Sequence, residues 1–231
     1  MASLTPTLIA RGAEAEIYLV DFLGMKVVVK KRVSKPFRNP VFNKVFIEHR
    51  TRTEAKVLSE LYLAGVSVPS LLLVDEEAGV IVMEYIEGAR LSDSLGLLRE
   101  SAVEAIGEAI GKYAALMHNM GIYHGDFTLA NVLLVRSSES GNRVVIIDFG
   151  LAGYSTDIEE YAIDLHLMSR SVEALYPELA EVFTRAVFRA YREHSKVGGD
   201  SVIRKVSEIR TRGRYVDREL RKAVLRERYV E

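Results

Sequence analysis

At 231 residues, the chain is long enough to fold as one large domain or as two small lobes with a real core. Its hydrophobic content of 48%, charged content of 27% and formal net charge of −1 give no overall attraction to nucleic acid or to an anionic membrane. No apolar run approaches the about 18 residues of a membrane span, and the N-terminus lacks the basic start and apolar core of a secretory signal. The absence of cysteine excludes disulfides, thiolate metal ligands and a cysteine nucleophile. We therefore expect a cytoplasmic protein that makes no membrane contact.

The first third of the chain predicts strands followed by one helix. The β-branched runs AEIYLVDF and MKVVVKKRV are joined by Leu23-Gly24, which predicts a tight hairpin. Pro36 and Pro40 break the next stretch, and helical spacing of apolar residues then predicts a helix over residues 47–65. Two further strands are expected on either side of a turn at residues 76–79.

The pattern then becomes helical. The stretch SAVEAIGEAIGKYAALMHNMG opens with a predicted capping box, Ser101 and Glu104, and ends at a glycine. Its apolar residues form one stripe, made of Val103, Ile106, Ile110, Ala114 and Met117. From Ser155 onward the sequence is almost wholly helical. We therefore predict an α+β fold with two lobes, a sheet-rich N-terminal lobe over residues 1–87 and a helical lobe with a basic C-terminal tail over residues 88–231.

Five features suited to phosphoryl transfer follow one another along the chain. In order, they are a possible phosphate-covering turn formed by Gly12, Ala13, Glu14 and Ala15, then Lys30 at the end of a strand, Glu54 on the following helix, Asp126 and Asn131 in HGDFTLAN, and Asp148 after the apolar run VVII. The order of these features carries more information than any single one.

Each feature has a physical role at an ATP site, where positioning and electrostatics do most of the catalysis. The ammonium group of Lys30 can contact the α- and β-phosphates if a carboxylate, that of Glu54, keeps it aimed. Mg²⁺ prefers oxygen ligands, and Asp148 together with the amide oxygen of Asn131 provides them. Asp126 would orient the acceptor hydroxyl or a water molecule and take its proton.

Taken alone, each feature has an ordinary structural explanation. Asp126 can be a turn residue or a helix cap, Lys30 a solvated strand end, and Glu54 part of an exposed helix face. The sequence Asp148-Phe149-Gly150 can be a plain exit from a strand. The combination of all five in this order favours an ATP site.

The segment VMEYIEG is the candidate hinge that binds adenine. Backbone groups of Glu84 and Ile86 can bond to the edge of the purine, with Met83 behind them. Apolar residues that alternate along a strand would produce the same pattern for reasons of core packing alone. His124 is assigned an orienting role within its loop.

The motifs HGDFTLAN and IIDFG resemble the protein-kinase-like fold, in the branch in which His-Arg-Asp becomes His-Gly-Asp. RIO-type kinases and aminoglycoside phosphotransferases share that feature. The combination of GAEAEIYL, RTRTEAKVL, DFGLA and RTRGR is more similar to the small RIO-related kinase/ATPase subunits of the KEOPS complex. The likeness covers nearly the whole chain.

The resemblance implies a two-lobed fold and an enzyme that uses ATP and Mg²⁺. It implies autophosphorylation on serine or threonine when the chain is alone, and ATP hydrolysis when it is assembled. The implied partners are the threonylcarbamoyl-transferase subunit and other KEOPS subunits, in a complex that makes threonylcarbamoyladenosine in tRNA. It also implies that Asp164 braces the catalytic loop, although a polar residue on a helix surface would have the same sequence pattern.

Two departures from ordinary protein kinases narrow the expected activity. The phosphate-covering turn has Gly12 alone where three glycines are usual, and Glu14 adds a negative charge unless it points away. After Gly150 the chain runs almost directly into a helix, without an Ala-Pro-Glu element, so the activation segment is minimal. An acceptor such as water, the chain itself or one fixed partner is therefore favoured over general protein substrates.

The C-terminal region is locally basic. Arg210, Arg212 and Arg214 in RTRGR have no acidic residue between them, and planar guanidinium groups suit phosphate. They are candidates for contact with tRNA or a partner, and a solvated helix with internal ion pairs is the alternative. The basic stretch over residues 30–56 is a second candidate contact surface.

Two other functions remain open from the sequence. A small-molecule phosphotransferase of the aminoglycoside or choline type would need an acidic pocket from longer C-terminal helices, whereas this end is short and basic. An ATP-binding pseudokinase that acts as a scaffold would not need the complete catalytic set, but Glu14 and the sparse glycines are compatible with it.

Overall fold

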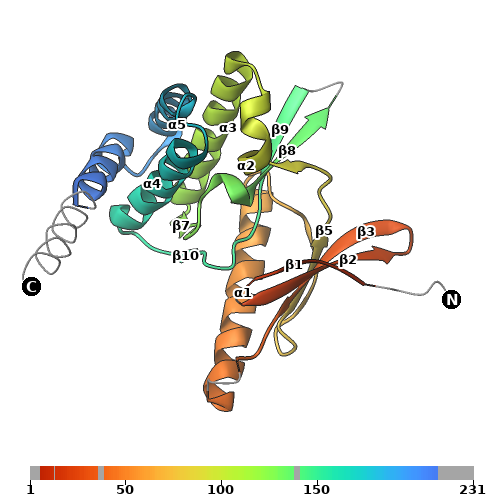
Figure 1. Cartoon of the computed structure of the whole chain (residues 1–231). Helices are drawn as coiled ribbons and strands as arrows, with labels where there is room; N and C mark the ends of the chain where they lie inside the picture. Colours follow the sequence, from red (N-terminus) through yellow and green to blue (C-terminus); the bar gives the residue numbers. More distant parts are fainter. Residues whose placement is uncertain (1–5, 13, 36–38, 138–140, 213–231) are drawn as a thin grey trace, which may run out of the picture.

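The computed structural model describes residues 6–12, 14–35, 39–137 and 141–212 (Figure 1). An antiparallel sheet with one long helix forms the N-terminal part, and a mainly helical part follows it. This arrangement confirms the predicted α+β fold with two lobes.

The sheet of the N-terminal lobe has the strand order β1-β2-β3-β5-β4. Its strands are β1 (Thr7–Arg11), β2 (Ala15–Phe22), β3 (Met25–Arg32), β4 (Leu71–Asp75) and β5 (Val80–Glu84). The predicted hairpin between β2 and β3 is confirmed, and Leu23 (φ 54°) and Gly24 (φ 81°) form its turn. Strand β3 is central, and it places Lys30 between Ile17 and Ile81 of its two neighbours.

Helix α1 (Pro40–Leu63) begins earlier than the expected start near residue 47. Pro40 breaks a strand pattern, but it stands at the first helical position, where its missing N–H group costs nothing. The side chain of Asn39 accepts hydrogen bonds from the backbone N–H groups of Val41 and Phe42 and so caps the helix. Pro40, expected to break this stretch, is therefore the first residue of the helix.

Among the described residues, the helices of the second lobe include α2 (Leu91–Ser94), η1 (Leu95–Leu97), α3 (Glu100–Asn119), η2 (Leu129–Asn131), α4 (Ile158–Leu175) and α5 (Ala180–His194). Residues 199–212 are also helical. Short strands complete it, with β6 (Ala89–Arg90), β8 (Val132–Ser137) and β9 (Gly141–Ile146) in one sheet and β7 (Ile122–Tyr123) paired with β10 (Gly153–Tyr154). In Figure 1, α3, α4 and α5 lie together, away from the five-stranded sheet.

The apolar stripe predicted for α3 is confirmed, because all five of its residues are buried. The predicted capping box is wrong. The carbonyl oxygen of Arg99 accepts the first helical bonds, from the N–H groups of Ala102 and Val103 at 2.9 and 3.1 Å. Arg99 is therefore the N-cap, and Ser101 lies inside the first turn, where it cannot cap the helix.

One apolar core joins the two lobes. Val57, Leu58 and Leu61 of α1 belong to the same buried cluster as residues of α3, α4 and α5. Helices α3 and α5 approach each other closely at Gly111, where a Cβ atom would collide with the carbonyl oxygen of Val187. The core thus fixes the helix that carries Glu54 against the lobe that carries residues 124–131, the candidate catalytic loop.

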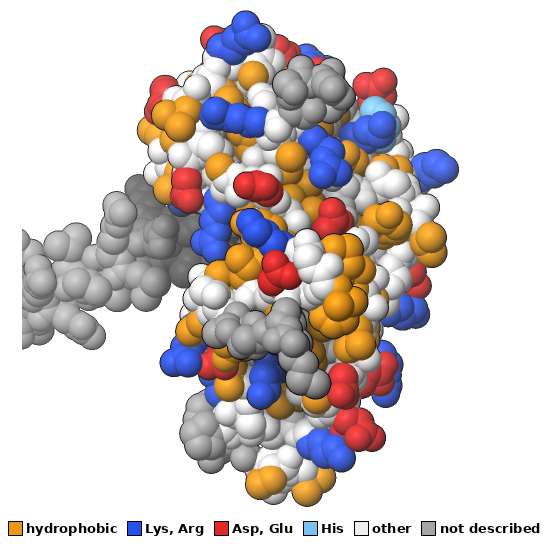
Figure 2. Space-filling view, turned by 90° about the vertical axis from the view of Figure 1, so that its right-hand side faces the viewer, with side chains coloured by type: hydrophobic (Ala, Val, Ile, Leu, Met, Phe, Trp, Pro, Cys, Tyr) orange, Lys and Arg blue, Asp and Glu red, His pale blue; other side chains and the backbone are white. Residues whose placement is uncertain are grey.

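On the face shown in Figure 2, basic and acidic side chains are interspersed with hydrophobic ones. This agrees with the near-neutral total charge. In the part of the chain that the structure describes, no helix is both long and apolar enough to cross a bilayer.

Candidate nucleotide site

A cleft of about 950 Å³ lies between the two lobes, a volume in the range of small-molecule sites. Eleven of the residues predicted for the site line it: Gly12, Glu14, Ala15, Lys30, Glu54, Met83, Glu84, Ile86, Asp126, Asn131 and Asp148. Ala13 lies outside the described residues. Folding thus brings residues from six separate segments of the chain to one cavity.

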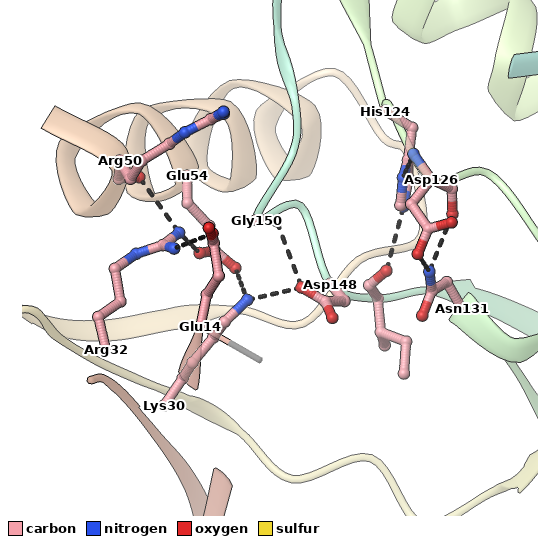
Figure 3. Close-up of polar contacts among 11 residues, drawn as sticks. Glu14, Lys30, Arg32, Arg50, Glu54, His124, Asp126, Asn131, Asp148 and Gly150 are labelled. Carbon is pink, nitrogen blue, oxygen red and sulfur yellow. Dashed lines mark hydrogen bonds and ion pairs between the residues drawn. The ribbon is translucent and has the colours of Figure 1, made fainter. Parts of the chain in front are cut away.

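Lys30 lines the cleft and lies between two carboxylates (Figure 3). Its Nζ lies 2.6 Å from Glu54 Oε1 and 2.6 Å from Asp148 Oδ1. Burial alone would lower the pKa of this amine, but the two carboxylates outweigh it and the pKa is raised above its ordinary value. Lys30 is therefore a charged ammonium group at neutral pH.

Glu54 is not on an exposed helix face, because it is only 1% exposed. Its second oxygen, Oε2, lies 2.6 Å from Nη2 of Arg32, a residue that the sequence reasoning did not single out. The available signal was strand periodicity, since Lys30 and Arg32 are two apart on β3 and therefore share a face. Glu14 points toward the same guanidinium group, with Oε2 3.9 Å from Nη1, so its charge is directed at a cation.

Asp148 adopts a left-handed backbone conformation, with φ of 62°, just after the apolar run of β9. This region is sparsely populated by non-glycine residues, although aspartate tolerates it better than most. Burial raises the pKa of the Asp148 carboxyl, but Lys30 and the backbone N–H of Gly150 lower it by more, and the net shift is downward. The group is thus an anion on the wall of the cleft.

Asp126 and Asn131 lie on the other side of Asp148 (Figure 3). The Asn131 amide nitrogen donates to Asp126 Oδ2 and to the Asp126 carbonyl oxygen, both at 2.9 Å. Its nitrogen is thereby committed to Asp126, and the amide oxygen is the atom that can bind a cation. Both side chains are accessible from the cleft.

His124 connects the catalytic loop to the strand before Asp148. Its Nδ1 accepts a hydrogen bond from the backbone N–H of Asp126 at 3.2 Å, so the proton is on Nε2, which donates to the carbonyl oxygen of Ile147 at 3.1 Å. The ring packs against Phe127 and Phe149, at centroid distances of 5.5 and 4.7 Å. His124 thus fixes the positions of Asp126 and Asp148 relative to each other.

Asp164 of α4 braces the same loop from behind. It is fully buried, and its two oxygens accept hydrogen bonds from the backbone N–H groups of His124 at 2.6 Å and Gly125 at 2.9 Å. His118 of α3 contacts it at 3.3 Å. Of the two explanations that the sequence left open for Asp164, the structure supports bracing, and a surface position is excluded.

At the candidate hinge, only part of the predicted backbone edge is free. The Glu84 N–H donates to the carbonyl oxygen of Ser70 at 3.0 Å, so it is not available to a ligand. Ile86 lines the cleft and is 9% exposed, and its backbone N–H finds no acceptor among the described residues. This backbone N–H is therefore free to donate to a purine nitrogen bound in the cleft.

The donor set fits a magnesium-bound triphosphate. No group of three or more histidine, aspartate or glutamate side chains in the described part of the chain could hold a metal by itself. Mg²⁺ commonly binds through one or two carboxylates together with substrate phosphates, and Asp148 and Asn131 supply one carboxylate and one amide oxygen. Lys30 adds a positive charge beside them.

The basic residues near the C-terminus are partly committed to ion pairs. Arg210 Nη2 lies 2.7 Å from Glu173 Oε1, and Arg212 Nη1 lies 3.1 Å from Glu159 Oε1, both on α4. Arg214 lies outside the described residues. The two arginines therefore form ion pairs with helix α4, in addition to any pairs within their own helix.

Known protein sequences similar to this chain include a kinase family and subunits of a tRNA-modification complex. Residues 10–191 match the lipopolysaccharide kinase (Kdo/WaaP) family. A KEOPS complex subunit Bud32 of Pyrococcus abyssi is 36% identical over 218 residues, which cover 91% of this chain and 97% of that protein. A probable bifunctional tRNA threonylcarbamoyladenosine biosynthesis protein of Methanothermobacter thermautotrophicus is 36% identical over 93% of this chain, which spans only 38% of that longer protein.

Comparison with solved structures gives the same fold at lower identity. The Rio2 kinase from Chaetomium thermophilum, in a complex with ADP, Mg²⁺ and phosphoaspartate, superimposes with a TM-score of 0.58 at 18% identity. The match covers 89% of this chain and 71% of that one. The kinase-like fold predicted from the motifs is confirmed.

Proposed function

The chain belongs to the Bud32 family of KEOPS (EKC) complex subunits, and from this premise we propose that it is an Mg²⁺- and ATP-dependent serine/threonine kinase and ATP hydrolase that supports threonylcarbamoyladenosine modification of tRNA. One observation carries the proposal. Lys30 is held between Glu54 and Asp148 in a cleft whose other wall presents Asp126 and Asn131.

When bound, Mg²⁺-ATP supplies the phosphoryl group and a counter-charge for the phosphates. Lys30 would contact phosphate oxygens, and Glu54 would keep its ammonium group in place. Asp148 and Asn131 would hold the cation, and the N–H of Ile86 with the carbonyl oxygen of Glu84 would bind the adenine, in front of Met83. These groups lie on rigid strands or are fixed by hydrogen bonds, which is what positioning in phosphoryl transfer requires.

Asp126 would act on the acceptor. Its Oδ2 is held by the amide of Asn131, which leaves Oδ1 to accept the proton of a serine or threonine hydroxyl or of a water molecule. The segment between Gly150 and α4 is short, and β10 is its only strand among the described residues. This supports a water molecule, the chain itself or one fixed partner as the acceptor.

We further propose that the threonylcarbamoyl-transferase subunit and other KEOPS subunits are its partners, in the cytoplasm. The hinge would separate lobes at 1–87 and 88–231, since β5 ends at Glu84 and β6 begins at Ala89. Arg210 and Arg212, with Arg214, would contact tRNA phosphates or a partner, as guanidinium groups in exposed ion pairs can exchange an acid for a phosphate.

The test follows γ-labelled ATP with the chain alone and with the transferase subunit plus tRNA. Label on protein serine or threonine identifies the kinase, and released phosphate identifies the hydrolase. ADP release that depends on an aminoglycoside or choline would instead indicate a small-molecule phosphotransferase. Nucleotide binding with neither label nor phosphate release would indicate a scaffold.

Two variants test the assigned residues. D126N should lower turnover by about 10²-fold or more while the Kd for Mg-nucleotide changes little, because a general base acts mainly in the transition state. D148N should lower turnover and also weaken Mg²⁺-dependent nucleotide binding. D200N, an exposed aspartate that pairs with Arg192, is the control and should change neither. Full turnover in D148N would contradict the metal assignment.

A further inference from the structure

We propose that Arg32 is a positioning residue of the nucleotide site, which keeps Glu54 neutralised while Lys30 moves from Asp148 to the phosphates. This inference rests on the proposed function, because it concerns a step that only a nucleotide-binding site would need.

The contacts of Arg32 place it in the site and hold it there. It lies on β3, two residues after Lys30, and is 6% exposed. Its Nη2 contacts Glu54 Oε2 at 2.6 Å and the carbonyl oxygen of Arg50 at 3.5 Å, and its Nη1 faces Glu14 at 3.9 Å (Figure 3). The guanidinium group is therefore held by three residues on two segments, helix α1 and the candidate phosphate-covering turn.

The backbone of Arg32 is pinned in the same way. Arg32 pairs with Ala15, which ends the candidate phosphate-covering turn and begins β2, and its N–H donates to the carbonyl oxygen of Gly79 at 2.9 Å. On the side of Gly150, a Cβ atom would lie 3.7 Å from Arg32 Nη2 and 3.1 Å from Lys30 Nζ. Gly150 thus lies beside the ends of both side chains. Arg32 is held there by its contacts, whereas Lys30 ends in a compact ammonium group on a flexible chain.

The charges explain why two cations are needed. Glu54 is almost completely buried, and each of its oxygens contacts one cation. A buried carboxylate without a partner is strongly unfavourable. If Lys30 were its only partner, a shift of Lys30 toward phosphate would leave Glu54 uncompensated, so Glu54 would hold Lys30 back.

With Arg32 in place, Glu54 stays neutralised when Lys30 shifts. Asp148 would no longer need Lys30 as its counter-charge, because a bound cation would balance its negative charge instead. Lys30 is then free to bind phosphate oxygens while Glu54 still directs it. The expected signature is an effect of Arg32 on ligands that carry phosphate and no effect on ligands that lack it.

The experiment measures binding of adenosine, ADP and ATP to the full chain with Mg²⁺ by calorimetry. R32M should weaken the binding of ADP and ATP by about tenfold, because part of a buried ion pair is lost. Its affinity for adenosine should stay within about twofold of wild type. R32K keeps the positive charge but replaces the planar guanidinium group by a single ammonium group, so it should weaken the binding of ADP by about three- to fivefold. K31M changes the exposed neighbour on the opposite face of β3 and should have no effect.

Several results would overturn the inference. R32M with wild-type affinity for ADP would show that Arg32 is not needed, and an equal loss for adenosine and ADP would show a merely structural role. If R32M fails to fold, R32K decides in the same way: a loss confined to ADP and ATP supports the inference, and an unselective loss or none overturns it. Wild-type protein that binds no nucleotide would refute the proposed function instead.

Discussion

At the scale of single residues, the backbone explains why glycine stands between His124 and Asp126. Gly125 has φ of 80°, a conformation that side chains rarely adopt. A Cβ atom there would lie 2.5 Å from the carbonyl oxygen of Leu151, so there is no space for one. The loop that presents Asp126 therefore passes directly under the segment that follows Asp148, and only glycine allows both to keep their positions.

This argument predicts the effect of G125A. Positive φ and the collision with Leu151 should together destabilise the fold by about 2 kcal/mol or more, because strained backbone and steric overlap add. Turnover should fall by at least about tenfold, since even a small displacement of a catalytic group is costly. Urea unfolding and ATP turnover of the purified variant measure the two effects.

G24A is the control for G125A. Gly24 has φ of 81°, and nothing lies within 4 Å of the Cβ position there. Alanine at this hairpin turn should therefore cost about 1 kcal/mol of backbone strain and leave turnover unchanged. Equal losses of stability in the two variants would mean that the contact with Leu151 contributes nothing.

The sequence could indicate the charged residues of the cleft, because phosphoryl transfer needs given residue types in a given order. It could not show that Glu54 is shared by two cations, since that depends on burial and on which side chains meet across the sheet. It also left Asp164 open, because a brace and a surface aspartate have the same local sequence. The roles of Lys30, Asp126 and Asp148 at a bound nucleotide stay predictions.

At the scale of elements, a contact between β10 and α1 joins the parts that carry the site. The Tyr154 hydroxyl donates to Glu60 Oε2 at 2.8 Å, and Lys56 Nζ lies 4.8 Å from the centroid of the Tyr154 ring. Tyr154 also pairs with Ile122 of β7, which leads into the catalytic loop. The helix of Glu54, the segment after Asp148 and the strand that leads into the loop of Asp126 thus meet at one residue, Tyr154.

Y154F tests this contact. Loss of one hydrogen bond to a charged, partly exposed partner should reduce the free energy of unfolding by about 1 kcal/mol or less. Turnover should fall by about two- to fivefold, because α1 is held less firmly. Y62F, which alters an exposed tyrosine on the same helix, is the control and should match wild type.

The same contact has a pH dependence. Burial and then Glu60 raise the pKa of Tyr154 above its ordinary value of 10.0, so the folded state retains the phenolic proton longer than the unfolded state. The unfolded state then binds fewer protons above pH 10, and stability falls as pH rises. The difference in unfolding free energy between wild type and Y154F should therefore be constant from pH 7 to about 9.5 and shrink above about pH 10. If the difference between wild type and Y154F were the same at pH 11 as at pH 7, the raised pKa of Tyr154 would be contradicted.

The longer elements were predictable, with errors at their ends, whereas short strands such as β1, β6, β7 and β10 were not. Alternation and β-branched runs predicted β2 to β5, and 3.6-residue spacing predicted α3. The start of α1 was missed because Pro40 is both a strand breaker and a good first residue of a helix, and only the cap by Asn39 decides between them. The capping box predicted for α3 was wrong because the extended backbone ends at Arg99, so that Ser101 already lies in the first turn of the helix.

At the scale of the whole molecule, ion pairs between elements connect the last described helix to the rest. Arg210 and Arg212 contact Glu173 and Glu159 of α4, and all four side chains are at least partly exposed. Exposed pairs contribute little to stability, and interspersed charges such as those in Figure 2 give no long-range field. These arginines therefore contribute little to the free energy of unfolding, and any larger effect of replacing them must come from contact with a partner.

The double variant R210A/R212A separates the two possibilities. The free energy of unfolding should fall by less than about 1 kcal/mol, because both ion pairs are exposed. If the guanidinium groups bind tRNA phosphates, affinity for tRNA should decrease and the slope of log K against log salt should become shallower by about 1.5, since about two fewer counterions are released. The measurement is tRNA binding by the full chain between 50 and 300 mM salt.

R189A/R192A is the matched control, because it removes two exposed arginines of α5 that also pair with acids. This pair should leave both the tRNA affinity and the salt slope unchanged, which would locate the effect at the C-terminal helix rather than in total charge. An equal decrease with both double variants would indicate general electrostatic attraction. Unchanged tRNA binding in R210A/R212A would mean that these arginines act only on α4, so that RNA contact would have to come from another surface of the protein.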